Sequence, residues 1–385
     1  MPRRALIGLL VALAGARLAA ATDPHLDPAL MPGGCRSCHA GHGASASPML
    51  PIPQREVCLS CHDTRERADA EVRRGILAPG ARPPLLGAVL QKTAVHPLTP
   101  AAFSRHEAEA VTCTSCHSPH RRSTPLAARP AEGLPRVSTR DPERLEYELC
   151  ENCHGSSGPA TRSPLDLSRL FDATSRSFHP VHAPTEERSP SVRPALAGRQ
   201  ISCTDCHAND DRKGIRGPHG SAWPGLLAAN YVGVDGAEER GTTHELCWSC
   251  HDRDRVLSDD SPFPLHRLHV VAERASCATC HSAHGSVENR ALIRFGEETR
   301  FGGVSPSATR HRLAFDSASR GSGTCTLTCH GSDHADRPYG FGGLRLRGLS
   351  PGSSTPGAPP RTPGLRSGDV LSPHDRQRTP TPPPD

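Results

Sequence analysis

Residues 113–120 read Cys-Thr-Ser-Cys-His-Ser-Pro-His and residues 277–284 read Cys-Ala-Thr-Cys-His-Ser-Ala-His, and variants of this stretch recur along the chain. Seven segments have the form Cys-x-x-Cys-His, and an eighth has three residues between its cysteines. These eight segments use all 16 cysteines of the 385 residues. Because no cysteine is left over, the fold has to be interpreted around this motif.

The spacing of the motif predicts covalent haem attachment. Two thiols on one turn of chain reach the two vinyl groups at one edge of a haem, and the next residue carries an imidazole over the ring face toward the iron. A zinc site needs the cysteines but not a histidine after each second one. A thioredoxin-like motif occurs once, and eight disulfides would not require this spacing.

We therefore predict eight covalently bound haem c groups. Their thioether anchors are Cys35, Cys38, Cys58, Cys61, Cys113, Cys116, Cys150, Cys153, Cys203, Cys206, Cys247, Cys250, Cys277, Cys280, Cys325 and Cys329. Their proximal iron ligands are His39, His62, His117, His154, His207, His251, His281 and His330. The eighth motif has a wider loop, so a strained local disulfide or an unoccupied pair of thiols is the alternative there.

Histidine is also the expected second axial ligand. After Met1 only Met31 and Met49 remain, whereas 15 of the 23 histidines lie outside the motifs. Ligation by two histidines, without methionine, points to low potentials. The candidate distal ligands are His42, His96, His120, His179, His182, His219, His244, His266, His269, His284 and His311. We expect the others to be exposed or to support a ligand, namely His25, His106, His334 and His374.

The N-terminus indicates export. Arg3 and Arg4, an apolar stretch and Ala19-Ala20-Ala21 form a signal peptide over residues 1–21. No later segment has the roughly 20 apolar residues of a membrane-spanning helix. The net charge of +5 includes no basic run with interleaved aromatic residues, so nucleic acid is not an expected partner. We expect a periplasmic or extracellular protein.

The motifs fall into four pairs, which predict paired-haem modules at residues 22–90, 91–165, 172–258 and 262–340. A tail over 341–385 is rich in Pro, Gly, Ser and Arg and is expected to be disordered. Short helices are predicted before Cys150, capped at Asp141, and over Gln54–Arg74. With only 13 aromatic residues and 39 prolines, the chain should be mostly irregular with short α-helices, few or no strands, and a core of stacked haems.

The paired motifs resemble the doubled-CxxCH-motif family of multihaem c-type cytochromes over roughly residues 30 to 335. Pairs such as Cys113–His120 with Glu148-Leu149-Cys150 carry the resemblance. It implies bis-histidine haems in a packed chain with little regular secondary structure. It also implies electron transfer in the periplasm or outside the cell.

The sequence thus predicts an electron carrier that exchanges electrons with other cytochromes, quinol-linked donors or extracellular acceptors. One alternative is a multihaem oxidoreductase for a small nitrogen or sulfur compound, which requires an iron with an open coordination position. Every motif here ends in histidine and spare histidines are abundant, which favours closed irons. A further alternative is a homo-oligomer, a filament or a component of an outer-membrane conduit.

Overall fold

The computed structural model describes residues 23–39, 49–98, 111–120, 145–156, 166–184, 189–295, 303–319 and 321–340. The predicted signal peptide and tail lie outside these residues, as do His42, His106, His374 and the expected helix cap at Asp141. All 16 motif cysteines and all eight motif histidines lie inside them. None of the described helices is long and apolar enough to cross a membrane.

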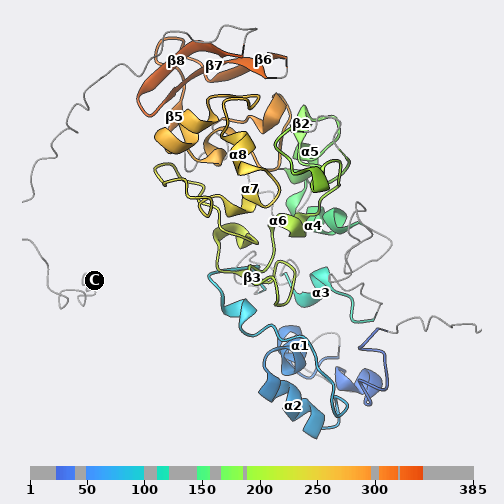
Figure 1. Cartoon of the computed structure of the whole chain (residues 1–385). Helices are drawn as coiled ribbons and strands as arrows, with labels where there is room; N and C mark the ends of the chain where they lie inside the picture. The colour runs from blue at the N-terminus through green and yellow to red at the C-terminus, as the bar shows by residue number, and fades with distance from the viewer. Residues whose placement is uncertain are drawn as a thin grey trace, which may run out of the picture. The chain divides into compact units, whose positions relative to one another are not determined.

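Short helices separated by irregular chain make up most of the described structure (Figure 1). The α-helices are α1 (Gln54–His62), α2 (Arg65–Arg73), α3 (Cys113–Cys116), α4 (Glu146–His154), α5 (Leu167–Leu170), α6 (Cys203–Cys206), α7 (Glu245–Trp248), α8 (Arg253–Val256) and α9 (Cys277–Cys280). Single 3-10 turns are η1 (Gly34–Ser37), η2 (Val89–Gln91), η6 (Pro194–Leu196), η7 (Pro224–Leu226) and η9 (Arg290–Leu292), and η8 (Arg267–Ala272) is a π-helix.

The predicted helix over Gln54–Arg74 is two helices, α1 and α2, that pack against each other. The break comes at Thr64, whose backbone is extended and whose hydroxyl accepts a hydrogen bond from the Arg67 amide. An N-cap of this kind starts a new helix by satisfying one of its free amides. The prediction of helix here was correct in type and wrong in continuity.

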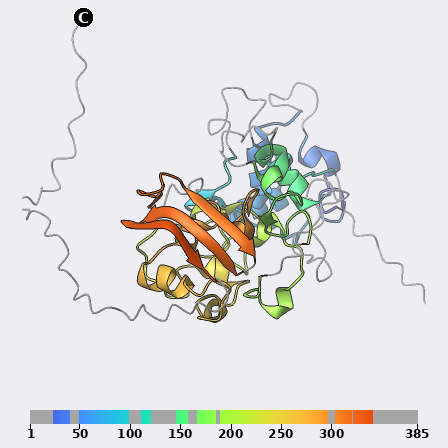
Figure 2. The ribbon, with the colours of Figure 1, turned by 90° about the horizontal axis from the view of Figure 1, so that it is seen from above.

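The strands correct the expectation that few or none would form. β1 (Ala94–Val95) pairs with β3 (Gly220–Ser221), and β2 (Ser177–Phe178) pairs with β4 (Gly285–Ser286). A four-stranded antiparallel sheet follows near the end of the described chain, with strands β5 (Val304–Ser305), β6 (Ala314–Ser319), β7 (Ser322–Cys329) and β8 (Ser332–Tyr339). Figure 2 shows the three long strands of this sheet side by side.

The sequence of β7 explains the sheet. Thr324, Thr326 and Thr328 alternate along it, and β-branched residues at every second position favour a strand. The two residues between β7 and β8, His330 and Gly331, have φ of 48° and 78°. Positive φ at both positions is the geometry of a type I′ hairpin turn. The eighth cysteine motif therefore lies on a hairpin, unlike the other seven.

Among the described residues, small polar side chains occupy the most buried positions. The largest side chains that are fully buried are Asn209, Thr279, Thr326, Ser221, Ser282, Ser286 and Ser307. One cluster of buried apolar residues, Met31, Ala68, Leu77 and Ala81, packs against Cys38 and Cys61. Larger apolar side chains such as Leu170 and Phe171 are buried singly at 3% and 6% exposure, so the described residues have little hydrophobic burial of their own to stabilise them.

Candidate haem-binding sites

Seven of the cysteine motifs lie on a helical turn. Each pair of cysteines falls within α1, α3, α4, α6 or α9, or spans the end of η1 or α7. A helix rises about 1.5 Å per residue, so cysteines three residues apart stand about one turn apart on the same side. The sequence prediction of a turn that presents both thiols to one haem edge agrees with this geometry. We number the sites 1 to 8 in chain order of their motifs.

Serine or threonine begins several of these turns. Thr112 precedes α3, Ser202 precedes α6 and Ser276 precedes α9. The Asp205 carboxylate accepts a hydrogen bond from the Ser202 amide at 2.8 Å, completing a capping box. Such caps fix where the four-residue helix starts, and so they fix the direction in which its cysteines point.

Eight pairs of histidine rings face each other among the described residues, with ring centres 5.8–6.4 Å apart. In seven of them the partner of a motif histidine is a histidine from outside the motifs. The seven are His39 with His120, His62 with His25, His117 with His219, His154 with His96, His207 with His284, His251 with His179, and His281 with His266.

This separation fits an iron between two imidazoles. A metal–imidazole bond is about 2 Å long and the ring centre lies about 1 Å behind its nitrogen, so two ligands on opposite sides of one iron have centres about 6 Å apart. Aromatic rings in ordinary contact also stand roughly 4.5–7 Å apart. Here, however, within the part of the chain that the structure describes, each motif histidine of sites 1 to 7 faces a histidine from outside the motifs, and the seven partners are all different.

The ring nitrogens agree with iron binding. His62, His207 and His281 each donate from Nδ1 to a backbone carbonyl, at 2.9, 2.8 and 2.8 Å. Among their partners, His219 donates from Nδ1 to the Arg216 carbonyl at 3.1 Å, and His179 donates to that of Ala283. A metal-binding histidine commonly donates its second N–H in this way, which fixes the ring and leaves Nε2 for the metal.

Burial keeps these rings in the neutral form that binds metals. Removal from water lowers the pKa of His219, His251 and His266 to about 4. The pKa is lowered for the same reason in His62, His96, His117, His154, His179, His207 and His281.

Two short strand ladders position four of the partner histidines. β1 is followed by His96 and β3 is preceded by His219, and the pairing of Val95 with Gly220 puts these histidines side by side. β2 and β4 repeat the arrangement. Phe178 pairs with Gly285, which places His179, the residue after Phe178, beside His284, the residue before Gly285. The two ladders thus hold the partners of sites 3 and 4 and of sites 5 and 6.

The glycines in these ladders have a specific role. A Cβ on Gly220 would collide with the carbonyl oxygen of Val89, and one on Gly285 with that of Leu170. In the sequence, His219 comes twelve residues after the motif histidine His207, and His284 comes three residues after the motif histidine His281. Both nevertheless precede Gly-Ser in equivalent ladders. The Gly-Ser after the histidine is the sequence signal for this position, and spacing from the motif is not.

Partner histidines often come from the next predicted module. His120, His219 and His284 face motif histidines of the preceding module, whereas His96 and His179 face motif histidines of their own. The paired modules at residues 22–90, 91–165, 172–258 and 262–340 stay a prediction as units. The contacts show that each of the first three modules takes one partner ring from the module that follows it.

The sulfur atoms of consecutive motifs lie next to each other. Hydrogen bonds join the thiols of Cys58 with Cys113, Cys150 with Cys203, and Cys247 with Cys277. These contacts connect site 2 with 3, site 4 with 5, and site 6 with 7. The donor thiols, those of Cys58, Cys150 and Cys277, have raised pKa values chiefly because of these hydrogen bonds.

The remaining junctions are also close. Burial is the main cause that raises the pKa of Cys206 to about 12, and the sulfur of Cys250 adds to this shift. Burial likewise raises the pKa of Cys280 to about 12, with contributions from the sulfurs of Cys325 and Cys329. Burial is the main cause of the raised pKa of Cys61, and the sulfur of Cys38 makes a smaller contribution. The hydrogen bond to Cys203 is the main cause of the raised pKa of Cys150, and the sulfur of Cys116 makes a smaller contribution. Three of the seven junctions thus have a thiol–thiol hydrogen bond, and at the other four a sulfur of one site raises the pKa of a thiol in the adjoining site.

Several predicted distal ligands face no motif histidine. His269 faces His334 instead, with ring centres 6.3 Å apart. Nε2 of His182 lies 2.5 Å from the Glu151 carboxylate, so the atom needed for iron is already engaged. His311 is exposed on a backbone with φ of 53°. No described histidine ring faces His330, whose Nε2 lies 3.1 Å from Asp235.

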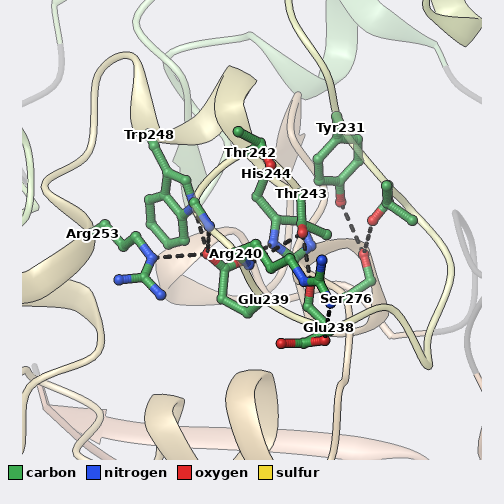
Figure 3. Close-up of polar contacts among 12 residues, drawn as sticks. Tyr231, Glu238, Glu239, Arg240, Thr242, Thr243, His244, Trp248, Arg253 and Ser276 are labelled. Carbon is green, nitrogen blue, oxygen red and sulfur yellow. Dashed lines mark hydrogen bonds and ion pairs between the residues drawn. The ribbon is translucent and has the colours of Figure 1, made fainter.

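His244 belongs to a buried polar cluster shown in Figure 3. Its Nδ1 lies 2.6 Å from Oε2 of Glu239, and Oε1 of Glu239 accepts hydrogen bonds from Arg253 at 2.9 Å and Trp248 at 3.3 Å. Burial alone would raise the pKa of Glu239, but the hydrogen bonds from Arg253 and His244 hold it below its usual value. The negative charge of Glu239 thus offsets the positive charge of Arg253 in this cluster, which lies between sites 6 and 7.

Two histidines that were expected to be exposed or to support a ligand are paired with another histidine. His25 faces His62, and His334 faces His269. His25 comes ten residues before the first cysteine, and His334 comes four residues after His330, one more than the spacing of three seen at His120 and His284. Nδ1 of His25 lies 3.2 Å from Asp23, and the spacing Asp-x-His was a usable signal.

A family model described as outer membrane cytochrome MtrC/MtrF-like, domains II/IV, matches residues 99–292, just over half of the chain. A model of the doubled CXXCH motif matches residues 28–67, which confirms that resemblance for sites 1 and 2. No curated protein and no solved structure matches. All 16 cysteines are free of disulfides, and the described residues contain no cluster of three or more ligands for a bare metal ion.

Proposed function

Since the chain belongs to the MtrC/MtrF-like outer membrane cytochromes, we propose that it is an octahaem electron-transfer protein of the cell surface that delivers electrons to extracellular acceptors. The observation that carries the proposal is the order of the sites. Three pairs of consecutive motifs share a thiol–thiol hydrogen bond, and at the other junctions a sulfur of one motif raises the pKa of a thiol in the next or preceding one. Haem sites that follow one another in chain order are what an electron-transfer chain requires.

The residues fit covalent haem c with two histidine ligands. Bound haem supplies the one-electron iron couple, and the protein sets ligation, spacing and exposure. The helical turns hold the thiols, the motif histidines take the proximal side, and the seven partner histidines take the distal side. Backbone carbonyls hold Nδ1 of rings such as His207 and His281, so that Nε2 faces the metal.

The paired rings favour a carrier over an enzyme. An oxidoreductase for a nitrogen or sulfur compound needs an iron with a free position. At sites 1 to 7 a second imidazole stands where a substrate would bind. The family match supports the cell exterior over the periplasm as the place of action.

The test is reoxidation of the purified protein. The reduced holoprotein is mixed anaerobically with a soluble ferric chelate, and in parallel with nitrite and with sulfite, while visible absorbance is followed. We expect complete reoxidation by the chelate and no consumption of nitrite or sulfite. Catalytic turnover of either anion, with the chelate inert, would replace this proposal with the enzyme.

A further inference from the structure

One arginine near the first two haem sites has no partner for its charge. Nη1 of Arg65 is buried, and no group among the described residues forms a hydrogen bond with it. Moving a charged nitrogen out of water without a partner is unfavourable, so buried charges in proteins are normally paired. We therefore expect an anionic group at Nη1 that the described side chains do not supply.

The acidic residues of α2 do not supply this group. Glu71 accepts hydrogen bonds from Arg74 on both carboxylate oxygens, at 2.9 and 3.0 Å. Neither Glu66, which is exposed, nor Asp69 bonds to Nη1 of Arg65. Arg65 is also the first residue of α2, where the helix dipole disfavours a positive charge. The helix itself therefore gives no reason for a buried guanidinium at this position.

The side of α2 that begins at Arg65 packs against the cysteines of sites 1 and 2. Ala68 and Val72 follow Arg65 by three and seven residues, and residues at this spacing share one side of a helix. Ala68 is 1% exposed and belongs to the apolar cluster against which Val72, Cys38 and Cys61 pack. Figure 1 shows α2 beside α1, the helix that holds Cys61. Arg65 therefore lies on the side of α2 that covers the first two haem sites.

The haems predicted at these two sites carry the anion that Arg65 lacks. Besides the vinyl groups that the cysteines bind, each haem has propionate side chains, which are carboxylates. A guanidinium matches a carboxylate in shape as well as in charge, because two parallel N–H groups can donate to its two oxygens. A propionate is therefore the chemical class of partner that a buried arginine beside a haem site fits.

On the basis of the function proposed above, we infer that Arg65 binds a propionate of one of the two haems at sites 1 and 2. It is a positioning residue, since it acts on the iron through the propionate. Its positive charge also raises the potential of that haem, because a nearby positive charge stabilises the reduced form, which carries one positive charge fewer.

The first test is a redox titration of the purified, haem-containing protein, followed by visible absorbance. Arg65→Gln removes the charge at the buried nitrogen, and Arg73→Gln removes a charge from an exposed position on the same helix. We expect both variants to retain every haem. Arg65→Gln should shift the potential of one haem downward, whereas Arg73→Gln should give the titration curve of the unmodified protein.

The second test observes the propionate itself. The haems are isotopically labelled at their propionate carboxyl carbons, and infrared difference spectra are recorded between the oxidised and reduced protein. We expect Arg65→Gln to shift a labelled carboxylate band. Arg65→Lys should shift the band as well, because lysine lacks the planar pair of donors, but it should keep the haem potential close to that of the unmodified protein, because lysine retains the charge.

The labelled band decides the result. An unchanged band in Arg65→Gln would overturn the inference even if the potential moved, because the charge would then act without binding the propionate. If Arg65→Gln does not fold, Arg65→Lys replaces it, and an unchanged band there has the same meaning. A purified protein without haem would remove the proposed function itself, whereas a haem-containing protein with unchanged spectra overturns the role of Arg65 alone.

Discussion

At the scale of the residue, the assignment of ligands depends on which ring nitrogen is already bonded. His219 donates from Nδ1 and faces His117, whereas His182 has its Nε2 against Glu151. Both were equal candidates by sequence. Their hydrogen bonds separate them, because a histidine binds iron through the nitrogen that nothing else occupies.

Replacement of His219 by alanine should therefore open one iron. We expect one of the low-spin irons to become high-spin, or to take up cyanide quickly, with no change in the number of covalent haems. His182→Ala is the matched control and should leave every iron low-spin. Visible and electron paramagnetic resonance spectra make the comparison, and equal behaviour of the two variants would refute the assignment.

Glu239 gives a second prediction at this scale, for stability. Its carboxylate has no exposed surface and accepts hydrogen bonds from Arg253 and Trp248, while it contacts His244. Glu239→Gln removes the charge and leaves buried donors without an acceptor, which should lower the free energy of unfolding by about 2 kcal/mol. Denaturant titration measures the loss.

The neighbouring Glu238 is the control for this change. It pairs with Arg240 at the surface, where the two side chains are 57% and 70% exposed. Exposed ion pairs contribute little because water and salt screen them. Glu238→Gln should leave the free energy of unfolding almost unchanged, and a loss as large as that of Glu239→Gln would argue against the buried cluster.

At the scale of the element, two-residue ladders organise the middle sites. β2 and β4 place His179 and His284 side by side, and Gly285 makes the close approach to Leu170 possible. An alanine at 285 has to push the carbonyl of Leu170 away, and overpacking of this kind typically costs about 2 kcal/mol. We expect Gly285→Ala to lower the unfolding free energy by that amount.

Gly303→Ala provides the comparison, since no atom lies within 4 Å of a Cβ built at Gly303. It should change the unfolding free energy by less than about 0.5 kcal/mol. If the two variants are equally stable, the ladder is not a constraint on the sites.

The elements also show how far the sequence could be interpreted. The cysteine turns were predictable, because Cys-x-x-Cys-His has a specific geometric purpose. The sheet was missed although Thr324, Thr326 and Thr328 alternate, because the same residues were interpreted only as a haem motif. The partners of the motif histidines depend on tertiary contacts such as that between His117 and His219, and spacing along the chain does not encode those.

At the scale of the whole molecule, the chain has little to hold it together without its cofactors. The largest fully buried side chains of the described residues are polar, from Asn209 to Ser307, and the chain has only 13 aromatic residues. Hydrophobic burial is the main favourable term of folding. The porphyrins that the cysteines anchor would supply this missing apolar volume.

The unmodified polypeptide should therefore be largely unfolded, as metal-dependent small folds are. We expect the chain, expressed without residues 1–21 under conditions in which no haem is attached, to give no cooperative transition on heating. Circular dichroism and proton NMR test this against the holoprotein under the same conditions. A sharp melt with dispersed resonances in the haem-free chain would show that protein contacts suffice.

The central claim is that haem covalently fills a series of consecutive two-histidine sites. The measurement that tests it most directly is the intact mass of the purified protein, combined with the spin state of its iron. We expect a mass that exceeds that of the polypeptide by eight haem groups, and low-spin iron at every site. A colourless, iron-free protein, or one with high-spin iron at several sites, would contradict the account.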